Sequence, residues 1–102
     1  MPKIKIEKST PMPAAEAFQR VKLMMLNDGD LKRMDPSCQF EFNDTACKGT
    51  GKGKMFSANV SVSTSGQVVI EVDLPLMLTP AKGMVEKTLE RKLKAALGDS
   101  TT

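Results

Sequence analysis

Few side chains in this sequence have the types and spacing that catalysis needs. The chain has no histidine, which excludes Ser–His, Cys–His and histidine–metal sites. Cys38 and Cys47 lie among apolar neighbours, and no basic side chain shares their strand face to activate a thiol. Glu71 and Asp73 have the spacing of paired carboxylates, but they fall on the polar face of their strand rather than inside a pocket. We therefore expect no enzyme, no catalytic residue, no metal and no cofactor.

The charge pattern does not indicate a nucleic-acid partner. Fifteen basic and twelve acidic side chains give a formal net charge of only +3. Lys48, Lys52 and Lys54 follow one strand without exposed aromatic residues that could stack on bases. No apolar run approaches the roughly eighteen residues of a membrane span, and residues 1–8 lack the apolar core of a signal peptide. We expect a cytoplasmic protein with reduced cysteines and no transmembrane segment.

The elements that would position any site follow from the spacing of apolar residues. Strict alternation over residues 3–8 predicts a short strand, and Pro11 and Pro13 then open a helix that ends near Leu26. Residues 31–34 add a further helical turn. From residue 38 the period changes to two, which predicts four strands at residues 38–43, 45–51, 56–62 and 68–74.

The last predicted element is a long amphipathic helix. Thr79 is a suitable N-cap and Pro80 suits the first helical position, while Gly98 suits the position after the helix end. A loop of three residues at 64–66 would place Val62 opposite Val68 and keep one apolar face along the sheet.

The element order is β-α-β-β-β-β-α, which is an α+β fold. We expect a curved antiparallel sheet packed on the long C-terminal helix, as in a small helix-grip-like sandwich, with the first strand at a sheet edge. Residues 1–98 form a single domain and residues 99–102 a polar C-terminal tail.

The glycines of the third strand are the first candidate for a ligand site. Gly49 and Gly51 share one strand face, which means either that the sheet curls around a helix or that a ligand lies on this face. Met55, Met84 and Val85 would complete a pocket for an apolar or acyl ligand, because thioether side chains repack easily. Core filling, in a chain with only four aromatic residues, is the simpler explanation of the methionines.

The segment between the last strand and the last helix is the second candidate. Leu76, Met77 and Leu78 make it apolar, and Lys82 follows. It is either buried under the helix or exposed as a surface that contacts a granule, a membrane or a partner.

The chain resembles the small bacterial polyhydroxyalkanoic-acid-system family. The residues that carry the resemblance are 72–78 (VDLPLML) and 80–86 (PAKGMVE), with Glu90, Leu93 and the opening Pro2-x-Ile4-x-Ile6. Members of that family often have a histidine near the end of the first strand, where this chain has Ser9-Thr10, so no site built on that histidine is expected. The family has no established activity, and the resemblance implies only a link to storage polyester.

These observations lead to one function hypothesis and two alternatives. The first is a non-enzymatic protein that binds an apolar ligand or a granule-type surface, linked to polyhydroxyalkanoate or acyl metabolism by resemblance alone. The second is a structural interaction module that acts as a homodimer. The third and weaker one is an unrecognised enzyme of acyl metabolism, which would need a polar group with a shifted pKa inside a pocket.

Overall fold

A computed structural model describes residues 3–98 of the chain, and for residues 30, 31 and 34 the backbone alone. The predicted polar tail, 99–102, lies outside the described residues. The elements along the chain are β1 (Lys3–Ser9), α1 (Ala14–Leu26), α2 (Gly29–Met34), β2 (Gln39–Asn43), β3 (Lys48–Lys52), β4 (Ser57–Val62), β5 (Gln67–Asp73), the 3-10 helix η1 (Leu76–Ala81) and α3 (Lys82–Ala96).

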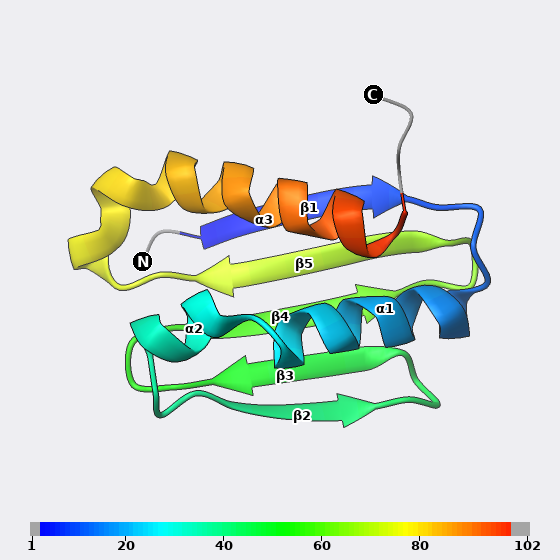
Figure 1. Ribbon diagram of the computed structural model, residues 1–102, viewed down its shortest axis with the longest axis horizontal. Helices are drawn as coiled ribbons and strands as arrows, with labels where there is room; N and C mark the ends of the chain where they lie inside the picture. Colours follow the sequence, from blue (N-terminus) through cyan, green and yellow to red (C-terminus); the bar gives the residue numbers. More distant parts are fainter. Residues whose placement is uncertain (1–2, 99–102) are drawn as a thin grey trace.

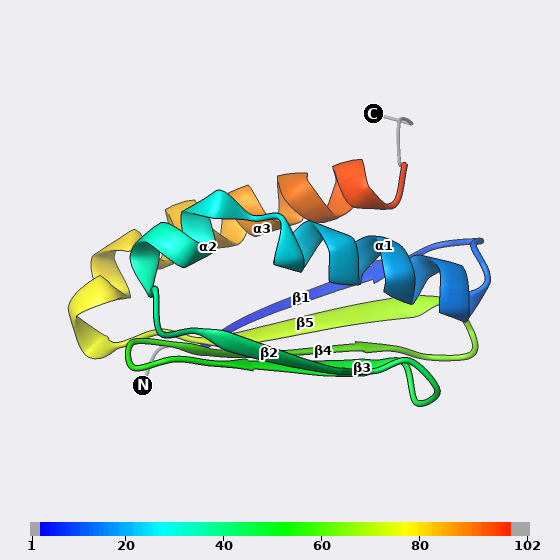
Figure 2. The same cartoon turned by 60° about the horizontal axis from the view of Figure 1, so that its bottom comes forward.

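The five strands form one antiparallel sheet in the order β1-β5-β4-β3-β2. The first strand therefore lies at an edge beside the last one, as predicted. Both long helices cover the same face of the sheet, α3 over β1 and α1 over the central strands β4 and β5 (Figures 1 and 2). The structure confirms the α+β class with a helix-grip arrangement.

The register of the sheet follows from its alternating apolar residues. Val62 lies opposite Val68 and Val60 opposite Ile70, which confirms the three-residue loop between β4 and β5. Gly66 ends this loop with φ = +87°, a conformation that favours glycine. Its carbonyl accepts the Thr10 N–H at 2.8 Å and so ties the end of β1 to the loop.

The core lies between the helices and the covered sheet face. Its fully buried members come from both layers. The largest are Phe18, Ile4, Leu74, Leu93, Val21 and Val68. Burying side chains of this size contributes roughly 1.5–3 kcal/mol each, so the apolar periodicity of the strands and helices specifies how the layers meet.

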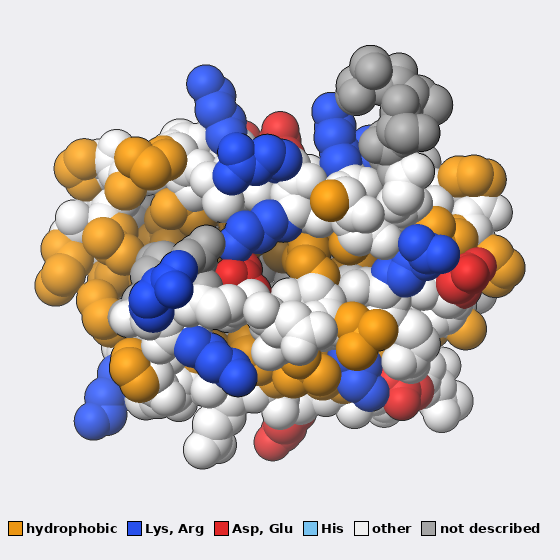
Figure 3. Space-filling view, viewed as in Figure 1, with side chains coloured by type: hydrophobic (Ala, Val, Ile, Leu, Met, Phe, Trp, Pro, Cys, Tyr) orange, Lys and Arg blue, Asp and Glu red, His pale blue; other side chains and the backbone are white. Residues whose placement is uncertain are grey.

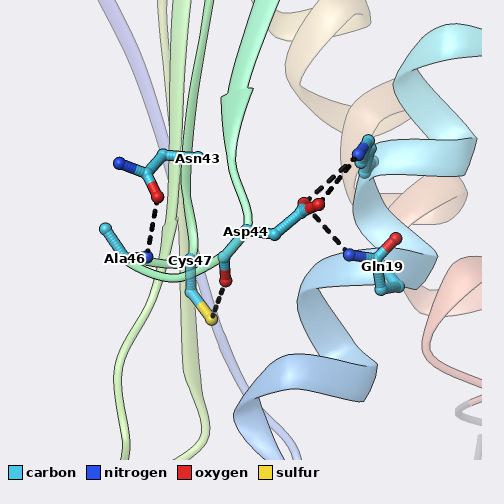
Figure 4. Close-up of polar contacts among 6 residues, drawn as sticks. Gln19, Asn43, Asp44, Ala46 and Cys47 are labelled. Atoms are coloured by element: carbon cyan, nitrogen blue, oxygen red, sulfur yellow. Dashed lines mark hydrogen bonds and ion pairs between the residues drawn. The ribbon is translucent and has the colours of Figure 1, made fainter.

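The β2–β3 hairpin is attached to α1 by polar and aromatic contacts. The Asp44 carboxylate points at the helix, where Gln19 donates to it at 3.0 Å and Lys22 at 3.2 Å (Figure 4). The Phe42 ring packs edge-on against Phe18, with 6.1 Å between ring centroids. These contacts attach the outer hairpin to the exposed flank of α1.

Two predicted boundaries were wrong. The second strand of this hairpin begins at Lys48 rather than at residue 45, because Asn43 Oδ1 accepts the Ala46 N–H at 3.0 Å and Cys47 turns the chain with φ = +54° (Figure 4). Helix α3 begins at Lys82, and the Thr79 hydroxyl donates to the Leu76 carbonyl at 2.7 Å inside η1 instead of capping α3.

Candidate ligand-binding site

A small apolar cavity lies between the sheet and the two long helices. Its volume is about 40 Å³ and it is partly enclosed. Nearly all of its wall is apolar. The lining residues come from α1 (Met24, Met25), the α1–α2 turn (Asp28), the sheet and its flanks (Phe56, Ala58, Ile70, Val72, Leu74) and α3 (Val85, Leu89). It holds more than the roughly 10–15 Å³ that one water needs, but it is far below the roughly 300–1,000 Å³ of a pocket for a drug-sized ligand.

One ion pair supplies the charge at this cavity. The Lys92 ammonium donates to both carboxylate oxygens of Asp28, at 2.8 and 2.9 Å. Asp28 is only 9% exposed and Lys92 comes from the facing helix. The pair therefore joins α1 to α3 and neutralises the carboxylate at the cavity wall.

The two strand glycines lie under phenyl rings and not on the cavity wall. A Cβ at Gly49 would be 2.6 Å from the Phe42 ring, and a Cβ at Gly51 would be 2.7 Å from the Phe40 ring. The close approach that the glycines indicated is therefore made by the neighbouring strand β2, which pairs with β3 in this register. The Phe42 ring lies between Gly49 and Phe18 of α1, so ring packing under the helix fills this position.

Of the other three predicted ligand contacts, one lies on the cavity wall and two do not. Val85 lines the cavity. Met55 is 39% exposed in the β3–β4 turn and Met84 is 72% exposed on α3, and neither lines the cavity. Two other methionines, Met24 and Met25, lie in the wall, because they are on the buried side of α1.

The predicted contact surface is an exposed 3-10 helix. Leu76 and Met77 are 71% and 74% exposed, whereas Leu78 is half-buried against the core and Lys82 is half-buried at the start of α3. No side chain of η1 is fully buried. The segment therefore lies over the edge of the core and leaves part of its apolar surface in water.

The groups with shifted pKa values lie outside the cavity. The Ser37 hydroxyl and the Met55 N–H, at 2.8 Å, donate to Asp35 and lower the pKa of this buried carboxyl. Burial, together with the negative charge of Asp35, raises the pKa of the Cys38 thiol, which makes it a poor nucleophile. Asp35 therefore fixes the β3–β4 turn. Among the described residues no group of three or more acidic or cysteine side chains could hold a metal ion.

Sequence reasoning missed Asp28 and Lys92 as site residues. Asp28 stood in an Asn-Asp-Gly sequence that predicts a helix end, and Lys92 stood on the polar side of a helix pattern. Neither has a local signal for pairing, because they are 64 residues apart.

No protein-family model and no curated protein matches this chain. Two solved structures resemble it in fold. The protein TTHA0849 from Thermus thermophilus has a TM-score of 0.67 at 11% identity, over 99% of this chain and all of that one. Ara h 8.0201, a Bet v 1-like allergen, has a TM-score of 0.52 at 14% identity, over 95% of each chain. The chain adopts a helix-grip fold.

At these identities the likeness shows the fold alone. The resemblance to the polyhydroxyalkanoic-acid-system family stays a prediction, since neither structure carries that name. None of the helices in residues 3–98 is long and apolar enough to cross a membrane.

Proposed function

We propose that the protein is a non-enzymatic binding protein that takes a small apolar ligand, or the apolar chain of a larger one, between the sheet and α3. The observation that carries the proposal is the apolar cavity itself, partly enclosed and lined from α1, the sheet and α3. Apolar pockets with few polar groups are the usual form of small-molecule sites. The likeness to a Bet v 1-like protein supports the location, since the fold places a long helix across a curved sheet.

Binding of an acyl chain requires the cavity to widen. At about 40 Å³ it accommodates only a small part of such a chain. The first turns of α3, which contribute Val85 to the wall, are the part that can move together with η1, because the fully buried side chains of α3, Leu89 and Leu93, begin only at its middle. Val85 would move outward with this segment.

The resemblance to the polyhydroxyalkanoic-acid-system family makes medium-length acyl chains the first ligands to test. A cytoplasmic location fits this proposal, because both Cys38 and Cys47 are free thiols, as is usual in a reducing compartment. Within the proposal the protein holds the chain and performs no step on it.

Native mass spectrometry of the gently purified protein, followed by titration with decanoate, tests the proposal. Ala58→Val adds two methyl groups on the cavity wall and should abolish an adduct and weaken decanoate binding at least tenfold. Asn59→Val makes a similar change on the opposite, exposed face of the same strand and should leave binding unchanged. A clean dimer without adduct or decanoate binding would overturn the proposal in favour of a homodimeric interaction module.

A further inference from the structure

Three large apolar side chains protrude together at one end of the molecule. Leu76 and Met77 of η1 and Met84 of α3 are 71%, 74% and 72% exposed, and we call them the apolar tip. Figure 3 shows hydrophobic side chains gathered at the left end, where Figure 1 places η1 and the start of α3. Exposed apolar groups that cluster in this way usually mark an interaction surface.

Basic side chains surround this end. Lys82 lies between Met77 and Met84 along the chain. Lys52 and Lys54 line a shallow groove that reaches Pro75, the residue before η1. Figure 3 shows lysine and arginine side chains beside the left-hand apolar group, with an acidic side chain between them towards the centre of the face.

Two acidic residues near the apolar tip, Asp73 and Glu86, do not cancel the positive charge of these lysines. Asp73, in the same groove, lies 3.9 Å from the ammonium of Lys3. Glu86 is half-buried, one helical turn beyond Lys82, and Lys87 follows it. The surface around the tip is therefore apolar at its centre and cationic at its rim.

The tip is continuous with the cavity wall. Leu74 lines the cavity two residues before Leu76, and Val85 lines it directly after Met84. Leu74 and Val85, which flank the tip residues along the chain, therefore face the cavity, while Leu76, Met77 and Met84 are exposed to water. Any partner that holds the tip also holds the wall that must move for a ligand to enter.

We propose that the apolar tip inserts into an anionic phospholipid surface, from which the apolar ligand passes into the cavity; the second part of this proposal rests on the proposed function. An apolar centre with a lysine rim fits acyl chains below anionic headgroups. A second copy docked tip to tip would bring two lysine rims together, and this like-charge repulsion favours an anionic lipid surface over a second copy of the chain.

Vesicle sedimentation with the full chain tests this inference. Vesicles of phosphatidylcholine mixed with phosphatidylglycerol should bind the protein, and pure phosphatidylcholine vesicles should not. Leu76→Ser combined with Met77→Ser should weaken binding on the order of tenfold or more. Lys54→Gln and Lys82→Gln should each weaken it about fivefold, and added salt should weaken it further.

Matched controls separate this inference from the proposed function. Leu23→Ser removes a side chain that is 56% exposed on α1, away from the tip, and should leave vesicle binding unchanged. The tip variants should keep decanoate binding in solution, which would show that they fold and retain the cavity. Equal binding to neutral vesicles, or equal losses with Leu23→Ser, would overturn the inference. It would also be overturned if the tip variants converted a dimer into monomers while the wild type bound no vesicles.

Discussion

Lys92 and Asp28 connect the two long helices at the wall of the cavity, with the ammonium 2.8 Å from one carboxylate oxygen and 2.9 Å from the other. Asp28 follows the end of α1, and Lys92 lies between the buried Leu89 and Leu93 along α3. The pair therefore holds the part of α3 that contains the buried Leu89 and Leu93 against the end of α1. Among the described residues no ion pair of this kind holds η1 or the first turns of α3.

Replacing Lys92 with Met should lower the free energy of unfolding by about 1–3 kcal/mol, because the variant keeps the apolar stem and leaves a nearly buried carboxylate without this partner. Urea denaturation measures the change. Lys94→Met, an exposed position of the same helix, should change stability by less than about 0.5 kcal/mol. Adding Asp28→Asn to Lys92→Met should restore part of the loss, and equal effects of the two lysine variants would contradict this account of the pair.

Two glycine-to-alanine substitutions should have opposite effects. A Cβ at Gly53 would lie within van der Waals overlap of the Asp35 carboxylate, so Gly53→Ala should disrupt the β3–β4 turn and cost about 1–3 kcal/mol. At Gly83 on α3 nothing lies within 4 Å of the added atom, and Gly83→Ala should stabilise the helix by about 0.4–1 kcal/mol. Thermal unfolding of both variants measures the two changes in stability. A stabilised Gly53→Ala protein would show that the β3–β4 turn does not depend on the Asp35 carboxylate.

Asp35 should make the protein lose stability in acid. Hydrogen bonds from the Ser37 hydroxyl and the Met55 N–H hold its folded pKa below the ordinary value of 3.8. The folded state therefore binds fewer protons, and the stabilisation is present above the unfolded pKa and is lost as the pH falls through the folded one. Between about pH 5 and pH 2, unfolding free energy should fall more steeply for the wild type than for Asp35→Asn. If the unfolding free energies of the wild type and Asp35→Asn fell in parallel with pH, other carboxyls would dominate the loss of stability in acid.

The fold was predictable because each element carries its own periodicity. The alternation of Val60, Val62, Val68 and Ile70 defines both the buried face and the register, since a shift by one residue would expose all four. The start of α3 was not predictable in the same way. Thr79 and Pro80 satisfy the rules for a helix start, but the chain uses them in a 3-10 helix that turns it back over the core.

The candidate site was less predictable, because it depends on contacts between distant residues. The glycines of β3 indicated a close approach, and the sequence could not say that the Phe40 and Phe42 rings make it, since that follows from the β2–β3 pairing. The pairing of Lys92 with Asp28 likewise exists only once α1 and α3 lie side by side. Val85 was predicted at a ligand site together with Met55 and Met84, and of these three it is the one on the cavity wall.

The contact of Gly49 with Phe42 should be energetically specific. Gly49→Ala places a methyl group 2.6 Å from the ring and should destabilise the protein by about 1–3 kcal/mol. Phe42→Leu alone loses packing, but combined with Gly49→Ala it removes the overlap, so the double variant should be more stable than the sum of the single effects predicts. Additive effects in denaturation experiments would mean that the ring moves aside without cost.

Hydrogen exchange should divide α3 at its middle. Amides of η1 and residues 82–86 should exchange much faster than those of residues 89–96, because the fully buried side chains of this helix lie in its second half and the Lys92–Asp28 pair holds that half to α1. Decanoate should slow exchange in the first half, since a chain in the widened cavity gives Val85 and its neighbours new apolar contacts, and should leave the second half unchanged. Uniform protection along α3, in the presence or absence of decanoate, would show that the cavity wall is rigid, and a cavity of about 40 Å³ would then be too small for an acyl chain.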